Sequence, residues 1–220
     1  AIAFVRQIDR LPLPVKSSPG FLVNRILMAY LMEAMTILGE GVPAAAIDKA
    51  ALDFGMPMGP IELADVVGLD VCLAVAKNLS AHLGGTVPQK LVDMVSAGKL
   101  GRKSGSGFYT YKNGKPVKEK ITDDQINYTE LADRMILRFV NESMTCLREK
   151  IIADSDLLDA GMIFGTGFAP FRGGPMHYAY SLGVDVVVAK LNEFAQKFGE
   201  RFKPDAGWSS VKATPVKEEA

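Results

Sequence analysis

Histidine and cysteine are scarce in this sequence, with two residues of each among 220. The two histidines, His82 and His177, lie far apart and have no cysteine or carboxylate at metal-ligand spacing, so a zinc site is not predicted. The two cysteines, Cys72 and Cys146, cannot build a disulfide framework. So few cysteines suit a reducing compartment. Their apolar sequence neighbours indicate that both are small buried side chains.

Net charge and long apolar runs are also missing. The 25 Lys and Arg residues balance the 25 Asp and Glu residues, which argues against a nucleic-acid partner. No apolar run reaches the roughly 18 residues that a membrane-spanning helix needs. With 48% hydrophobic and 23% charged residues, most of the chain is predicted to be globular. Its length allows one large domain or two small ones.

Common catalytic and nucleotide-binding motifs are absent as well. There is no G-x-S-x-G elbow and no Walker loop. Gly105-Ser106-Gly107 and Gly165-Thr166-Gly167 each begin like a dinucleotide loop but lack the third glycine and the preceding strand. Lys103, close to the first pair, is interpreted as a surface-turn residue, with a phosphate contact as the alternative.

Helical periodicity is what the sequence does contain. The apolar spacing predicts a long helix from Phe21 to Leu38, and Asp123 is a candidate N-cap for a second one that runs to Lys150. Asn113-Gly114 predicts a hairpin turn after a strand at 108–111. Shorter helices are predicted at 44–54, 60–67, 70–83, 88–97, 155–163, 175–182 and 184–198.

The two halves of the chain match each other in order. The matched pairs are Asn24 and Asp133, Arg25 and Arg134, Glu33 and Glu142, Glu40 and Glu149, Asp48 and Asp159, Gly59-Pro60 and Gly174-Pro175, and Gly68 and Gly183. Glycine stops and helix lengths recur in the same sequence, which indicates a duplicated helical unit. Each long helix is apolar over most of its circumference, so we expect the two to pack together around a pseudo-twofold axis.

Asn24 is a polar residue at the start of a helix whose following residues are apolar on every side. Such a helix is central, which predicts that Asn24 is at least partly buried and needs hydrogen-bond partners. From the residues alone, a structural asparagine near the helix start is the first interpretation.

Three longer motifs add a family resemblance. They are Pro19-Gly20-Phe21-Leu22-Val23-Asn24-Arg25, Gly101-Arg102-Lys103-Ser104-Gly105-Ser106-Gly107-Phe108-Tyr109 and Phe168-Ala169-Pro170-Phe171-Arg172-Gly173-Gly174-Pro175. The first two resemble the C-terminal region of 3-hydroxyacyl-CoA dehydrogenases. The third resembles the second copy of that region in the multifunctional fatty-acid oxidation enzymes, and the resemblance covers essentially the whole chain.

The resemblance implies an all-α fold of two duplicated helical units packed as a pseudo-dimer, like the C-terminal domain of 6-phosphogluconate dehydrogenase, with a small β-hairpin near 108–117. The implied divisions are the end of an N-terminal Rossmann domain (1–16), a first repeat (17–111), a linker (112–122), a second repeat (123–208) and a tail (209–220).

The resemblance also implies a site. In the family an asparagine at the position of Asn24 lies beside the catalytic histidine and the 3-oxygen of the substrate, so Asn24 is expected to act by electrostatic positioning. Tyr178 falls where the family has a substrate-contacting tyrosine. His177 stands where the family often has arginine, which puts a CoA-phosphate contact there in doubt. NAD and the catalytic His–Glu pair belong to the Rossmann domain, so these 220 residues alone are expected to be inactive.

The implied function is oxidation of (3S)-3-hydroxyacyl-CoA in fatty-acid β-oxidation, within an enzyme that also carries enoyl-CoA hydratase. The implied partners are the acyl-CoA substrate and the Rossmann domain of the same polypeptide, and the resemblance allows for a thiolase subunit. The implied location is the bacterial cytoplasm, or mitochondria or peroxisomes in a eukaryote. Two alternatives stay open: a non-catalytic helical interaction module, and the helical domain of another NAD(P)-dependent dehydrogenase.

Overall fold

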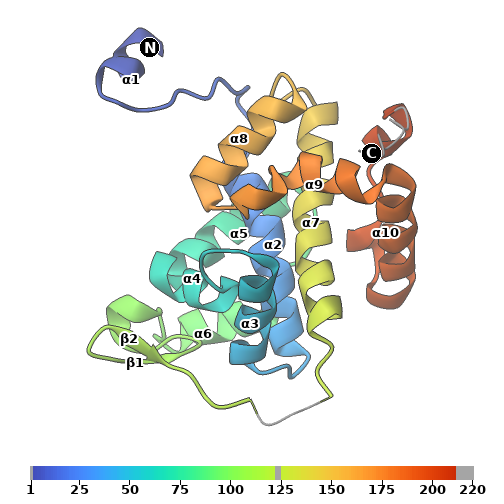
Figure 1. Cartoon of the computed structure of the whole chain (residues 1–220). Coiled ribbons are helices and arrows are strands. Elements are labelled where there is room, and N and C mark those ends of the chain that lie inside the picture. Colours follow the sequence, from blue (N-terminus) through green and yellow to red (C-terminus); the bar gives the residue numbers. More distant parts are fainter. Residues whose placement is uncertain (1, 122–124, 212–220) are drawn as a thin grey trace.

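The structure is a computed structural model that describes residues 2–121 and 125–211. Helices make up most of the described chain, which confirms the predicted all-α class with one small hairpin (Figure 1). After α1 (Ile2–Gln7), the first half forms α2 (Val23–Gly39), α3 (Ala44–Phe54), α4 (Pro60–Val67), α5 (Leu69–Leu83), α6 (Gln89–Ser96) and the 3₁₀ turn η1 (Arg102–Ser104). The second half forms α7 (Tyr128–Arg148), α8 (Ser155–Thr166), η2 (Pro170–Arg172), α9 (Pro175–Leu182), α10 (Val184–Phe198), η3 (Glu200–Phe202) and η4 (Ala206–Ser210).

The hairpin lies where its turn residues predict it. Strands β1 (Thr110–Lys112) and β2 (Lys115–Val117) are antiparallel, and Asn113 and Gly114 between them both have positive φ, at 52° and 74°. These angles suit the right-handed twist of a two-residue hairpin. β2 therefore occupies part of the segment 112–122 that was expected to be a linker. Lys118 extends this ordered part, because its Nζ lies 2.6 Å from Glu62 Oε2.

Two helix ends differ from the sequence prediction. The expected N-cap Asp123 lies outside the described residues, and α7 begins at Tyr128, where the side chain of Asn127 accepts a hydrogen bond from the backbone N–H of Glu130 at 3.0 Å. α8 continues through Gly165 to Thr166 instead of ending near Ile163. Gly165 serves packing here, because a Cβ at this position would lie 3.1 Å from the Val23 side chain.

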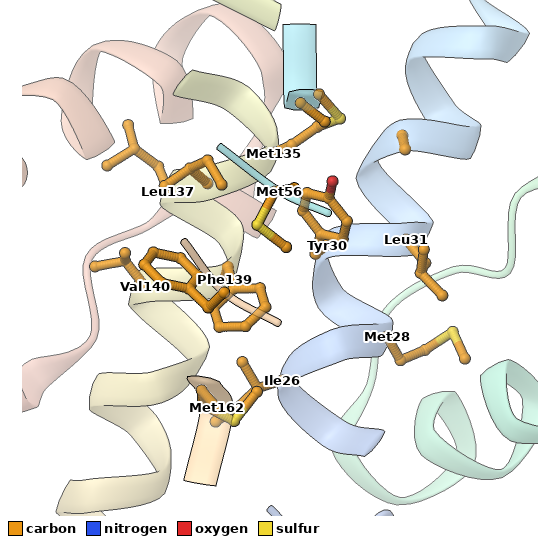
Figure 2. Close-up of a cluster of buried hydrophobic side chains, with 14 of the residues drawn as sticks. Ile26, Met28, Tyr30, Leu31, Met56, Met135, Leu137, Phe139, Val140 and Met162 are labelled. Carbon is orange, nitrogen blue, oxygen red and sulfur yellow. The ribbon is translucent and has the colours of Figure 1, made fainter. Parts of the chain in front are cut away.

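The core forms where α2 and α7 pack against each other, as predicted (Figure 1). Figure 2 shows Tyr30 of α2 directed toward Phe139 of α7, and their ring centroids are 6.0 Å apart in an edge-to-face arrangement. Both side chains are fully buried. Methionines and aliphatic residues from both helices and from α8 fill the surrounding space, so the two halves share one core.

Ion pairs show that α2 and α7 run antiparallel. Arg25, at the start of α2, pairs with Glu142 at 2.6 Å and with Glu149, just beyond the end of α7, at 2.7 Å. The counterpart Arg134, near the start of α7, pairs with the counterparts Glu33 and Glu40, both at 2.6 Å. An interface in which equivalent residues exchange contacts is the signature of twofold symmetry. The predicted pseudo-dimer is confirmed.

The N-terminal segment lies beside this body. Within residues 1–16, the segment expected to be the end of a Rossmann domain, residues 11–15 form no strand in the described chain; Pro12 and Pro14 lack N–H donors. The end of this segment is held instead by a hydrogen bond from the backbone N–H of Lys16 to the carbonyl of Ile151, at 2.8 Å.

Both cysteines are buried, as predicted, at 1% exposure for Cys72 and 0% for Cys146. Burial raises the pKa of Cys72 to about 11 and that of Cys146 to about 12. Of the helices in the described ranges, none alone has the length and apolar character to cross a membrane; α4 and α5 pass that test only as a pair bent by 99°.

Candidate functional site

Asn24 is the second residue of α2, and its side chain is exposed. The expectation of a partly buried Asn24 was therefore wrong. The buried stripe at the start of this helix passes through Leu22, Arg25 and Ile26, and the 100° rotation per residue turns Asn24 outward. Within residues 2–121 and 125–211 no hydrogen bond to the Asn24 amide is found, which leaves both its donors and its acceptor open to an external partner.

The residue next to Asn24 is fixed firmly. Arg25 is 4% exposed, and besides its two glutamates it reaches the hydroxyl of Ser18 at 3.5 Å. Burial by itself lowers the pKa of Arg25, but the hydrogen bonds and charges of Glu149 and Glu142 outweigh it and raise the pKa above its usual value. The first turn of α2 is thereby held in one position, and Asn24 is presented on a rigid element.

Exposed aromatic side chains occur on the two segments that meet next to Asn24. Val23 packs against Gly165 near the end of α8, so the start of α2 and the end of α8 meet next to Asn24. Each carries an exposed phenylalanine: Phe21 at 57% and Phe164 at 75% exposure. Large exposed apolar side chains near a polar group that lacks hydrogen-bond partners are typical of a surface that another domain or a ligand covers.

Tyr178 lies in α9, and its side chain is half-buried. Its ring stands edge-on to Phe54 from the first repeat, at 5.2 Å between centroids. The guanidinium of Arg172 lies 5.2 Å from the Tyr178 ring and 4.1 Å from the Phe54 ring, and its Nε donates to the Phe54 carbonyl at 2.9 Å. These contacts join the second repeat to the end of α3.

Among the residues that the structure describes, no hydrogen bond links Asn24 to Tyr178. Burial raises the pKa of Tyr178, the charge of Asp133 raises it further, and Arg172 opposes both. Asp133 is the counterpart of Asn24 in the second repeat, and it forms an ion pair with Lys190. The negative charge that acts on Tyr178 is thus that of the second-repeat equivalent of Asn24.

The Gly101–Tyr109 motif forms a loop over α4. The carboxylate of Asp65 accepts hydrogen bonds from the backbone N–H groups of Phe108 and Tyr109, at 2.9 and 2.8 Å. Gly101 and Gly107 pass so close to Asp65 that neither position has room for a Cβ. The glycines of this motif are explained by that close approach, so they are structural.

Lys103, in the same loop, is half-exposed and donates to Asp70 at the start of α5, with Nζ 2.7 Å from Oδ2. The pairing lowers the pKa of Asp70. This agrees with the interpretation of Lys103 as a surface-turn residue.

Two buried aspartates at equivalent positions had no assigned role in the sequence. Asp48 of α3 accepts from the backbone N–H groups of Ile61 and Glu62 at the start of α4. Asp159 of α8 does the same for the start of α9, with bonds from Met176 at 2.7 Å and His177 at 2.9 Å. The repeat alignment flagged both as matched residues, but their function as N-terminal caps depends on tertiary packing. His82 and His177 are exposed.

One segment of the chain is similar to a known domain family. Residues 20–111 match the family model of the 3-hydroxyacyl-CoA dehydrogenase C-terminal domain. The matched segment runs from the turn before Asn24 through the Gly101–Tyr109 loop to Tyr111.

Curated relatives match nearly the whole chain. The chain is 39% identical over 216 residues to the fatty acid oxidation complex subunit alpha of Vibrio vulnificus, and 38% identical over 219 residues to that of a Shewanella species. The matches cover 94% and 92% of this chain but 31% of each relative. The chain spans about a third of the length of these relatives.

Solved structures share the fold of this chain. The 3-hydroxybutyryl-CoA dehydrogenase of Escherichia coli superposes with a TM-score of 0.77 at 20% identity, over 94% of this chain and 62% of that one. The dehydrogenase part of multifunctional enzyme 1 from C. elegans gives 0.69 at 22% identity, over 96% and 52%. At these identities the likeness establishes the arrangement of helices.

NAD, which the family implies, does not fit the described residues. A dinucleotide loop joins a strand to a helix through a glycine-rich turn. β1 leads into β2, and the sequence after β2 contains no glycine before α7. Gly105 ends the η1 turn and Gly167 ends α8, so neither glycine pair opens a helix. No step in this chain is therefore assigned to NAD.

Proposed function

We propose that this chain is the substrate-binding helical part of an NAD-dependent 3-hydroxyacyl-CoA dehydrogenase that oxidises (3S)-3-hydroxyacyl-CoA to 3-oxoacyl-CoA. The Rossmann domain of the same polypeptide would hold NAD and supply the group that takes the proton. The observation that carries the proposal is Asn24, whose amide is exposed on a rigid helix start. The family domain around it, residues 20–111, supports the same assignment.

Asn24 acts by hydrogen-bond donation in this proposal. Its side-chain N–H₂ donates to the 3-oxygen of the substrate, whose charge changes as the carbonyl forms. The start of α2 has no side-chain cap and no acidic residue in its first turn, as far as the described residues show. The positive end of the helix dipole therefore adds to the stabilisation of negative charge on that oxygen. The ion pairs of Arg25 keep the donor in place, so the amide needs no reorganisation during the reaction.

Tyr178 is proposed as a second substrate contact, on the opposite repeat. Its support is the resemblance of residues 168–175 to the second copy of the family region, together with a half-exposed ring. The repeat boundaries, 17–111 and 123–208, are part of the same proposal. In this division α7 covers the face of α2 that a second subunit would otherwise cover, so homodimerisation through α2 is not required.

The names of the relatives suggest the wider setting. They support placing this chain in a multifunctional enzyme of fatty-acid oxidation. An enoyl-CoA hydratase in the same polypeptide and a thiolase subunit as a partner are proposed from the family resemblance alone. For a bacterial protein of this kind the proposed location is the cytoplasm. The alternative is that the chain is a non-catalytic interaction module, which predicts no dehydrogenase activity when the chain replaces the matching region of an active relative.

A chimera separates these alternatives. Residues 1–220 would replace the matching region of the Vibrio vulnificus relative, and NADH oxidation with acetoacetyl-CoA would be followed by absorbance. We expect the chimera to be active and the isolated 220 residues to be inactive. A folded chimera without dehydrogenase activity, judged by its melting temperature and its retained hydratase activity, would favour the interaction module.

A further inference from the structure

A cavity of about 580 Å³ lies between α2, the end of α5, and α7 with the segment after η3. Cavities of this size are typical of small-molecule sites. Its apolar lining side chains come from α2 and α5: Met28, Ala29, Met32, Leu79 and Leu83. Its charged lining side chains come from α2, from α7 and from the chain that follows α10: Arg25, Glu33, Arg138, Glu142, Arg201, Lys203 and Asp205.

Most charges of the cavity are already paired. Arg25 is neutralised by Glu142 and Glu149. Glu33 is held by Arg134 and by Arg201, whose Nε lies 2.6 Å from it, and Asp205 is held by Arg148. These pairs contribute little net charge to a ligand in the cavity.

Two cations remain without a carboxylate within 4 Å, counting every residue of the described ranges. Arg138 is half-buried, and its guanidinium donates to the backbone carbonyl of Arg201. Lys203 is exposed at the rim, with its backbone carbonyl fixed by the Asn141 amide at 2.9 Å. A guanidinium has five N–H donors, and removing it from water without an ion-pair partner has a desolvation cost; desolvation accordingly lowers the pKa of Arg138.

Arg138 is also where the two repeats differ. Its counterpart in the first repeat is Ala29, and the counterpart of Asn141 is Met32; all four residues line the cavity. At these two matched positions the second repeat has a polar side chain and the first repeat a small or apolar one. Packing of α2 against α7 alone does not require this difference, because the surrounding Arg–Glu pairs are symmetric.

We propose that this cavity binds a small organic phosphate, with the phosphate group on Arg138 and Lys203 and the apolar part on the Met28–Met32 face of α2 and on α5. A phosphate monoester carries close to two negative charges at neutral pH, which matches the two unpaired cations. The planar guanidinium donates two parallel hydrogen bonds to such a group, and lysine supplies a point charge. This site goes beyond the proposed dehydrogenase function and does not depend on it.

The test uses the 220-residue chain and hexyl phosphate as the probe, followed by titration calorimetry. The chain has one tryptophan, Trp208, whose indole N–H donates to Asn141 at 2.9 Å. The NMR signal of that indole therefore reports on the cavity wall. We expect saturable one-to-one binding that shifts this signal. Hexanoate and inorganic phosphate should bind at least tenfold more weakly, because each lacks one of the two recognised features.

Variants assign the binding to these residues. Arg138→Met should weaken hexyl phosphate at least tenfold without lowering the melting temperature, since it removes a half-buried cation and keeps an unbranched apolar stem. Lys203→Ala should weaken it about threefold to tenfold, and Lys90→Ala, an exposed lysine on α6, should not change it. No saturable binding, or unchanged affinity in Arg138→Met, would overturn the site. Equal affinity for hexanoate would overturn the phosphate assignment.

Discussion

Arg25 Nε lies 2.6 Å from Glu142 Oε1, and Arg134 Nη2 lies the same distance from Glu33 Oε1, so the two halves of the chain exchange equivalent ion pairs. Both glutamates stand eight residues after the arginine of their own helix. The exchange fixes the register of α2 against α7, and it places Asn24 beside the end of α7 and Asp133 beside the end of α2. The predictions below start from this relationship.

Arg134→Ala should lower the free energy of unfolding by about 3 kcal/mol. The substitution leaves Glu33, whose side chain is 1% exposed, with one arginine instead of two, and breaking a buried pair costs about 3–5 kcal/mol. Urea denaturation measures the loss. Arg6→Ala, on exposed α1, is the control and should stay within about 0.5 kcal/mol of the parent. A loss below 1 kcal/mol for Arg134→Ala would show that the exchanged pairs do not stabilise the interface.

Cutting the chain between Lys120 and Ile121 should give two pieces that are each poorly folded and that associate one to one when mixed. The cut lies after Lys118, so the hairpin stays with the first repeat. Each piece exposes one long helix whose apolar face the other covers. Circular dichroism of the separate and mixed pieces measures this, and Arg134→Glu in the second piece should weaken the association. Independently folded pieces that ignore each other would contradict the pseudo-dimer.

Asp159→Ala should destabilise the chain, and the loss should be larger at pH 5 than at pH 8. The loss itself is expected to be about 1–2 kcal/mol, because two backbone N–H groups at the start of α9 lose their acceptor. Burial raises the pKa of Asp159, so the folded chain binds the proton more tightly than the unfolded chain does. The contribution of Asp159 to stability therefore grows as the pH falls through its folded pKa toward its unfolded value. Urea denaturation of parent and variant at both pH values tests the sign, and a smaller loss at pH 5 would refute it.

Tyr178→Phe in the chimera should raise the KM for acetoacetyl-CoA about threefold to tenfold, the range that corresponds to one lost hydrogen bond of about 1 kcal/mol. The melting temperature should not change, because the ring contact with Phe54 is kept. Tyr180→Phe, on the same helix and also half-buried, is the matched control. If KM stays constant in Tyr178→Phe, the tyrosine serves only to pack the repeats.

The sequence alone predicted the helices and the hairpin well, because their signals are local. Gly55 ends α3 in the left-handed conformation, and Asn113-Gly114 forms the tight turn. It predicted the duplication because matched residues recur in order. The predicted end of α8 was wrong, because Gly165 is a residue type that often ends a helix but here lies inside the helix and contacts Val23. That contact is tertiary and leaves no periodic signal.

The site was predicted less well than the fold. The exposure of Asn24 was not predicted, because an apolar helix does not reveal which residue of its first turn faces outward. The role of Tyr178 as a substrate contact stays a prediction from the resemblance; nothing in the sequence indicated its packing against Phe54 and Arg172. The cavity around Arg138 was missed, since one arginine in a helix gives no sign of whether a glutamate lies opposite it.

The most direct test of the proposed function is the turnover of Asn24→Ala in the chimera. Loss of one positioned donor typically lowers kcat about 10²- to 10³-fold, and because Asn24 is exposed its removal should leave the melting temperature unchanged. Asp133→Ala, the counterpart in the second repeat, and Asn192→Ala, an exposed asparagine on α10, should keep kcat within about twofold. An unchanged kcat in Asn24→Ala, with or without a fall in melting temperature, would contradict the account.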